Sequence, residues 1–141
     1  MDVARRGLIV LIAISFAVMP QSAFACSCAQ STKPQQAERA AAIFTGTTTA
    51  VGRPLFGLSC SSADPVTVTF TVETVYKGEI PKDLALNTAS AGASCGYTFV
   101  AGKRYTVFVI GDHETNLCLG NVEGAIAPSE YGLGEGRSPR S

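Results

Sequence analysis

The chain has 141 residues, a formal net charge of zero and 46% hydrophobic residues, with no tryptophan. This length predicts one domain at most. Because Lys and Arg are not clustered, the sequence argues against electrostatic capture of nucleic acid or of an acidic membrane surface.

The N-terminal segment, residues 1–25, is typical of a cleaved secretory signal. Two arginines precede an apolar run from Gly7 to Met19, and Ala23-Phe24-Ala25 supplies small residues three before and one before a signal-peptidase cut. The run is short for a membrane anchor, which takes about 20 apolar residues. We expect the mature chain to begin at Cys26 and to keep no membrane span. A lipoprotein signal acylated at Cys26 is an alternative.

All five cysteines follow this segment, at positions 26, 28, 60, 95 and 118. Export would place them in an oxidising compartment, where disulfides are expected rather than catalytic thiols. Alternate side chains of an extended chain point the same way, so Cys26 and Cys28 can each bond a different later cysteine. Cys95 and Cys118 are the available partners, and four cysteines alone leave the pairing open. One cysteine, Cys60, is left over.

The first elements of the mature chain are a helix and a strand. Pro34 at a first helical position and the strong helix formers of 35–42 predict a short helix. Residues 43–52 are rich in β formers, and Gly46 is expected to mark a bulge or a close approach. A loop of Pro, Gly and Ser residues is predicted at 53–65.

The remaining strands are predicted from alternation and turn residues. Apolar and polar residues alternate over 66–73, which is the clearest strand pattern in the chain. A turn at Lys77-Gly78 and a short strand at 84–88 follow. Residues 104–110 are apolar on both faces and are expected to form a central strand. The pattern predicts an all-β fold with one or two short helices, closed into a small barrel.

The C-terminal segment, residues 128–141, is rich in Gly, Ser and Pro. Such a segment buries little apolar surface, so we expect it to be disordered. The folded domain is therefore expected to span residues 26–127.

Five short motifs occur in an order that is similar to one known family. They are Cys26-Ser27-Cys28, Pro34-Gln35-Gln36-Ala37, Val75-Tyr76-Lys77-Gly78, Ala93-Ser94-Cys95-Gly96-Tyr97 and Gly102-Lys103-Arg104-Tyr105. Across about residues 26–120 the chain resembles the N-terminal inhibitory domain of the tissue inhibitors of metalloproteinases, a netrin-like module. It departs from that family in lacking the cysteine usual in the helix, where Glu38 and Arg39 stand, and in having no second cysteine-rich domain.

The resemblance implies a fold and a disulfide pairing. The fold would be a five-stranded barrel of the oligosaccharide/oligonucleotide-binding (OB) type. The pairing would be Cys26–Cys95 and Cys28–Cys118.

The resemblance also implies a function, which is inhibition of a zinc metalloendopeptidase. The free amine and the carbonyl oxygen of Cys26 would chelate the catalytic zinc of the target, in the position that a water otherwise holds. The protease-contacting residues would be Ser27, Cys28, Ala29, Gln30, Ala93, Ser94 and Cys95. The protein would be a secreted monomer with no cofactor of its own; periplasmic retention and an outer-membrane anchor remain alternatives.

A second function class stays open, a secreted or cell-envelope netrin-like interaction module that inhibits no protease. The sequence shows no Ser–His–Asp order, no glycine-rich phosphate loop and no pair of carboxylates in a predicted cleft, so we do not expect an enzyme. The only histidine, His113, lies between Asp112 and Glu114 in a predicted turn and is expected to be solvated.

Overall fold

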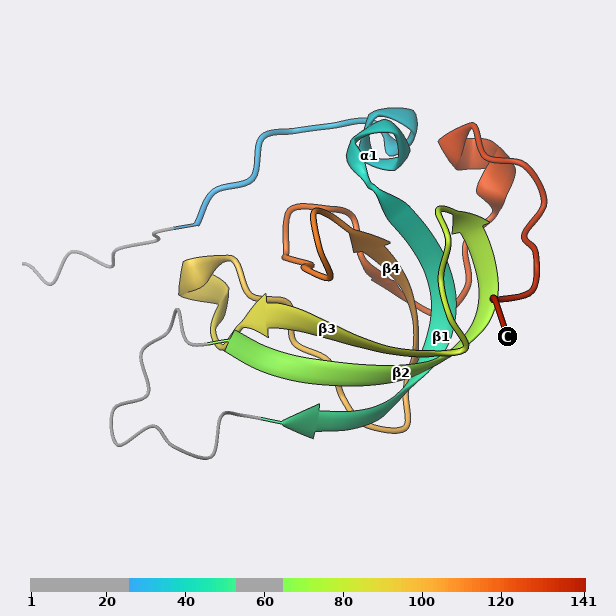
Figure 1. Ribbon diagram of the computed structural model, residues 1–141. Coiled ribbons are helices and arrows are strands. Elements are labelled where there is room, and N and C mark those ends of the chain that lie inside the picture. Colours follow the sequence, from blue (N-terminus) through green and yellow to red (C-terminus); the bar gives the residue numbers. More distant parts are fainter. Residues whose placement is uncertain (1–25, 53–64) are drawn as a thin grey trace, which may run out of the picture.

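The computed structural model describes residues 26–52 and 65–141, so the predicted signal segment and Cys60 lie outside the described residues. The described chain forms a five-stranded antiparallel sheet in the order β3-β2-β1-β4-β5. The strands are β1 (Ala42–Gly52), β2 (Pro65–Lys77), β3 (Asp83–Ala89), β4 (Arg104–Val109) and β5 (Val122–Glu123). Figure 1 shows that the sheet is strongly bent, with helix α1 beyond one end of β1. The predicted β class is confirmed.

The sheet does not close into a barrel, and that part of the prediction is wrong. Strands β3 and β5 are the two edges of the sheet. The chain after β4 reaches β3 through one parallel bridge, in which Asn87 N donates to His113 O over 2.9 Å and Thr115 N donates to Asn87 O over 3.0 Å. A continuous closing ladder is prevented because β5 has only two residues and Gly124, with a φ of 87°, follows it directly.

Helix α1 (Lys33–Arg39) begins with a capping box. The Thr32 side chain accepts a hydrogen bond from Gln35 N, and the Gln35 side chain accepts one from Thr32 N. The helix starts earlier and ends earlier than predicted, because Ala40 is extended and Ala41 N donates to Val109 O over 2.7 Å. The last residues of the predicted helix therefore lead into β1.

The main core lies on one face of the sheet. The alternation predicted for β2 is confirmed, because Val66, Val68, Phe70 and Val72 are all buried. Neighbouring rings meet edge to face, with centroid distances of 5.4 Å for Phe44–Phe70 and 5.2 Å for Phe70–Phe99. This cluster consists of Ala42, Phe44, Val66, Val68, Phe70, Val72, Val75, Ile80, Leu84, Leu86, Phe99, Tyr105, Val107 and Val109.

Two further sequence predictions about the sheet are confirmed. The register of β1 against β2 shifts between Thr45 and Gly46, and a Cβ at Gly46 would lie 2.7 Å from the Thr71 carbonyl oxygen. Strand β4 lies between β1 and β5, and all of its residues after Arg104 are buried. Gly46 is thus a bulge and a close approach, and β4 is an internal strand.

The C-terminal segment is ordered, so the prediction of a disordered tail is wrong. A 3₁₀ helix, η2 (Pro128–Tyr131), buries Tyr131 to 6% exposure in a second apolar cluster beside α1. Strand β3 pairs with β2 only as far as Thr71, which leaves the later part of that β2 edge open. Val75 and Arg137 exchange two backbone hydrogen bonds of 2.8 Å there. Burial of the Tyr131 ring and backbone pairing along the open edge of β2 therefore order this segment despite its glycine-rich composition.

Candidate functional site: a disulfide-anchored N-terminal ridge

The extended segment before α1 is fixed to the domain by two disulfides. Cys26 is bonded to Cys95 and Cys28 to Cys118, with Cα separations of 5.3 Å and 5.2 Å. This is the pairing that the family resemblance implied. The bonds span 69 and 90 residues. Closing loops of this length stabilises the fold by about 4 to 5 kcal/mol each in the chain-entropy model.

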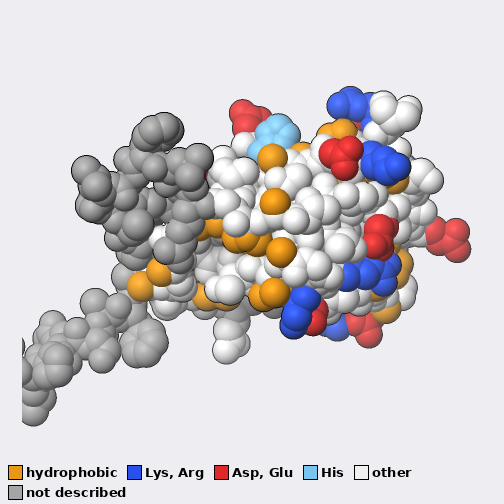
Figure 2. Space-filling model, turned by 90° about the horizontal axis from the view of Figure 1, so that it is seen from below, with side chains coloured by type: hydrophobic (Ala, Val, Ile, Leu, Met, Phe, Trp, Pro, Cys, Tyr) orange, Lys and Arg blue, Asp and Glu red, His pale blue; other side chains and the backbone are white. Residues whose placement is uncertain are grey.

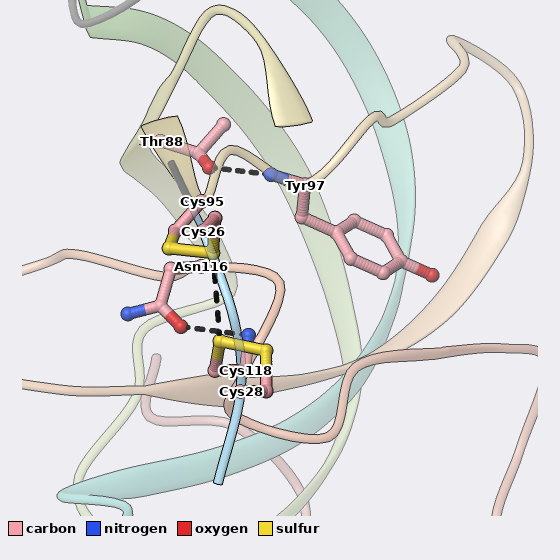
Figure 3. Close-up of a disulfide and its surroundings, with 7 residues drawn as sticks. All are labelled: Cys26, Cys28, Thr88, Cys95, Tyr97, Asn116 and Cys118. Carbon is pink, nitrogen blue, oxygen red and sulfur yellow. Dashed lines mark hydrogen bonds between the residues drawn. A yellow bond between two sulfur atoms is a disulfide. The ribbon is translucent and has the colours of Figure 1, made fainter. Parts of the chain in front are cut away.

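Figure 3 shows the two disulfides next to each other along the N-terminal segment. Successive side chains of an extended chain point to opposite sides, so Cys26 and Cys28 both point toward their disulfide partners. Cys26 is half-buried, whereas Cys28 is exposed. The intervening Ser27 is exposed, as are Ala29 and Gln30.

The predicted contact residues come together in the structure. Ala93 is exposed at the tip of η1 (Gly92–Ser94), and the half-buried Ser94 and Cys95 follow it. The Cys26–Cys95 bond joins this turn to the N-terminal segment. We call residues 26–30 together with 93–95 the N-terminal ridge. It contains no charged side chain.

The η1 turn is closed by backbone hydrogen bonds. Cys95 has a positive φ of 61°, and Cys95 N and Gly96 N donate to the carbonyls of Gly92 and Ala91, both over 3.0 Å. A Cβ at Gly96 would lie 2.0 Å from the Ala89 carbonyl oxygen, so only glycine fits there. These contacts fix the turn against the end of β3.

The loop that carries Cys118 is held by a buried hydrogen-bond network that sequence reasoning missed. Asn121 Oδ1 accepts from Phe108 N over 2.7 Å, and Asn121 Nδ2 donates to Thr115 Oγ1 over 2.7 Å. Thr115 Oγ1 in turn donates to the Phe108 carbonyl over 2.8 Å. An asparagine among loop residues carries no pattern that predicts such burial. The network ties the Cys118 loop to β4.

One backbone hydrogen bond connects this loop to the ridge, and a second closes the loop on itself. Leu117 N donates to the Cys95 carbonyl over 2.8 Å, and Cys118 N donates to Asn116 Oδ1 over 2.9 Å. Leu117 itself is 46% exposed beside the ridge. The loop thus presents one apolar side chain to solvent next to Cys28 and Cys95.

Residues of the ridge line two hollows. One, of about 260 Å³, is lined by Pro65, Asn87, Thr88, Ala89, Ser94, Cys95, Glu114, Thr115 and Asn116. The other, of about 390 Å³, is lined by Cys28, Ala29, Gln30, Ser31, Gln36, Leu117, Cys118 and Gly120. Residues of the ridge therefore contribute to the walls of both hollows.

The ridge itself has no charged side chain, although Glu114 lines one of the hollows next to it. Elsewhere on the described surface, charged side chains form four ion pairs. Arg104 contacts Glu73 at 2.6 Å and Lys103 contacts Glu123 at 3.2 Å. On the face in Figure 2, acidic and basic side chains lie next to each other. His113 is exposed in the loop after β4, as the sequence predicted.

Burial raises the pKa of the Tyr97 phenol above its ordinary value, with smaller contributions from Tyr105 and Glu123. Tyr97 lies directly beyond the η1 turn, and its backbone N donates to Thr88 Oγ1 over 3.0 Å. Its ring packs against Phe99 and Tyr105. The turn is thereby connected to the aromatic core.

Among the described residues, one group of side chains of metal-ligating type lies close together, and it consists of cysteines of the two disulfides. The sulfurs of Cys26, Cys28 and Cys118 lie within 4.8 Å of one another.

Among the described residues, no helix has the length and apolar character needed to cross a membrane. Compared with known proteins, the chain matches no family model and no curated protein.

Proposed function

We propose that the protein is a secreted metalloproteinase inhibitor that acts through the N-terminal amine of Cys26. The observation that carries the proposal is the covalent anchoring of Cys26 to Cys95 at the end of an exposed, uncharged ridge. Signal cleavage after Ala25 would free the Cys26 amine at that point.

The anchored cysteine is suited to bind a metal in a partner's active site. A catalytic zinc has three protein ligands and an open position. The α-amine and carbonyl oxygen of one residue can close a five-membered chelate on that ion. The disulfide restrains both atoms before binding, which lowers the ordering cost of association. The zinc belongs to the target protease, and the inhibitor needs no cofactor of its own.

The rest of the ridge would occupy the substrate cleft of the protease. Ser27, Ala29 and Gln30 are exposed and would lie along the cleft on one side of the zinc. Ala93 and Ser94 would form the second contact edge. Because the ridge carries no charge, it enters a cleft without the cost of burying an unpaired ion.

The order of the strands supports the proposal of an OB-type fold. The order β3-β2-β1-β4-β5 with a single parallel bridge between Asn87 and Glu114 is compatible with a partly open OB-type barrel. We propose that the domain is a netrin-like variant of that fold in which β3 and β5 fail to pair.

The test is inhibition of a panel of zinc endopeptidases by the exported protein. Its N-terminal sequence and intact mass are determined first. A variant with one Ala added before Cys26 should lose inhibition, because its amine no longer lies beside the anchored carbonyl. A variant with one Ala added after Ser141 is the matched control and should inhibit like the wild type.

The amine also predicts a pH dependence. Only the unprotonated amine binds zinc, and the ordinary pKa of an α-amine lies just above neutrality. Inhibition should therefore weaken as the pH falls below neutrality.

The second candidate is an interaction module without zinc chelation, favoured by the exposed Leu117 and the two hollows beside the ridge. Blocking or extending the N-terminus would leave such binding intact. A correctly cut protein that inhibits no zinc endopeptidase would favour this candidate.

A further inference from the structure

The N-terminal part of the ridge, residues 26–30, is attached to the domain by its two disulfides. Within residues 26–52 and 65–141, no hydrogen bond between nitrogen or oxygen atoms joins this segment to the rest of the domain. The place of the Cys26 amine therefore depends on how firmly the two disulfide partners, Cys95 and Cys118, are held.

One loop connects these two partners to each other. Leu117 N donates to the Cys95 carbonyl over 2.8 Å, and the next residue, Cys118, is bonded to Cys28. A shift of this loop would therefore move both attachment points of the N-terminal segment.

The base of the loop is fixed to β4 at the point where β5 has ended. Strand β5 pairs with β4 only at Tyr105 and Thr106. The Phe108 N–H and carbonyl bond instead to the side chains of Asn121 and Thr115, over 2.7 Å and 2.8 Å. Both of these side chains belong to buried residues. They take the place of a longer β5 and hold the base of the loop against the sheet.

Asn116 connects the base of the loop to its tip. Its carbonyl oxygen accepts a hydrogen bond from Asn121 Nδ2 over 3.2 Å, and its side-chain Oδ1 accepts one from Cys118 N over 2.9 Å. Figure 3 shows the Asn116 side chain beside the Cys28–Cys118 disulfide. A bond from an asparagine side chain to the backbone two residues on is an Asx turn, which fixes the backbone between them.

We propose that Asn116 is a positioning residue for the inhibitory N-terminus. Its side chain fixes the backbone of Cys118, and through the Cys28–Cys118 bond it holds the segment that carries the Cys26 amine. The inference rests on the proposed inhibition, because it assigns Asn116 a part in presenting the atoms that bind the zinc of the protease. Order that is present before binding lowers the cost of association. Loss of the Asn116 side chain should therefore weaken inhibition while the domain stays folded.

The first test is amide-nitrogen NMR relaxation of the exported protein and of Asn116→Ala, with both disulfides intact. We expect the order parameters of Ser27 and Ala29 to fall from about 0.85, the value of rigid backbone, toward the flexible range below about 0.6. Asn116→Ser keeps a neutral, although weaker, acceptor at the same turn position and should recover most of this order. An unchanged urea midpoint separates positioning from a general loss of the fold.

The second measurement is the inhibition constant against a zinc endopeptidase that the wild type inhibits. Groups that orient a metal ligand contribute about 10- to 100-fold to metal affinity. Because Asn116 acts through two further residues, Asn116→Ala should raise the inhibition constant by the lower of these factors, roughly tenfold. Asn116→Ser should restore most of the inhibition.

The matched control is Thr47→Ala. Thr47 is half-buried like Asn116, and its side chain makes a hydrogen bond of 3.0 Å, to Glu73 on the sheet. This variant should change neither the order parameters of the N-terminal segment nor the inhibition constant.

Unchanged order parameters in Asn116→Ala would overturn the inference whether or not the protein inhibits a protease. Greater mobility with an unaltered inhibition constant would also overturn it, because the N-terminal segment would then need no positioning before it binds. A wild type that inhibits no zinc endopeptidase would refute the proposed function, and the order parameters would still decide whether Asn116 holds the segment in place.

Discussion

The ring of Tyr131 lies 5.5 Å from the ring of Phe108, and this contact joins the C-terminal segment to the side of β4 that faces α1. Lys33, the first residue of α1, pairs with Glu130 and lies 5.5 Å over the Tyr131 ring. The Glu130 hydrogen bond raises the pKa of Lys33. The C-terminal segment therefore supports the helix that directly follows the N-terminal ridge.

This packing predicts that Tyr131 is needed for stability. Tyr131→Ala should lower the free energy of unfolding by about 3 kcal/mol, because it removes a buried ring and leaves a cavity. Tyr131→Phe keeps the ring and should cost less than about 1 kcal/mol. Urea unfolding measures both. If Tyr131→Ala unfolds at the wild-type urea concentration, the segment does not pack on the sheet.

The buried network at Asn121 predicts a second stability effect. Asn121→Ala leaves the Phe108 N–H without its acceptor, and an unsatisfied buried group costs about 1 to 3 kcal/mol. The exposed Asn87→Ala is the matched control and should change stability by less than about 0.5 kcal/mol. Thermal unfolding compares the two, and equal losses would contradict a special role for Asn121.

A third prediction contrasts two glycines of β1. A Cβ at Gly46 would lie 2.7 Å from the Thr71 carbonyl oxygen, whereas the nearest atom to one at Gly52 is 3.8 Å away. Gly46→Ala should therefore destabilise the fold by about 1 to 3 kcal/mol, and Gly52→Ala should stay within about 0.5 kcal/mol of wild type. Urea midpoints with unchanged slopes are the measurement. Similar midpoints for the two variants would show that β1 and β2 are not this close at Gly46.

The raised pKa of Tyr97 predicts a loss of stability in alkali. The folded state keeps the Tyr97 proton to higher pH than the unfolded state, so unfolding releases a proton in this range. Stability should fall as the pH rises through the ordinary tyrosine pKa of about 10. Tyr97→Phe should show a shallower fall, measured as urea midpoints across this pH range. Parallel curves would rule out a contribution from Tyr97.

Much of the sheet could be predicted because its strands alternate or are apolar throughout. Strand β2 shows its buried face directly in the sequence, and Gly46 marks the bulge. The ends of the helix could not be placed from helix propensity alone. Ala41 and Ala42 favour helices, but their backbones pair with β4, so α1 ends at Arg39.

The errors have a common physical origin in long-range contacts. Composition predicted disorder after Pro128. The structure instead packs the Tyr131 ring against Phe108 and pairs the backbone of Arg137 with that of Val75 at the open edge of β2. Barrel closure failed as a prediction because it depends on pairing between β3 and β5, which local pattern does not encode. The cysteine pairing came from the family resemblance, since the spacing alone allowed other partners.

The most direct measurement of the central claim is the visible spectrum of a Co²⁺-substituted zinc endopeptidase that the exported protein inhibits. Chelation by the Cys26 amine and carbonyl predicts a change in the cobalt bands on binding. The form with one Ala added before Cys26 should leave the bands unaltered. Inhibition with an unchanged cobalt spectrum would contradict zinc chelation and would mean that the ridge blocks the cleft without touching the metal.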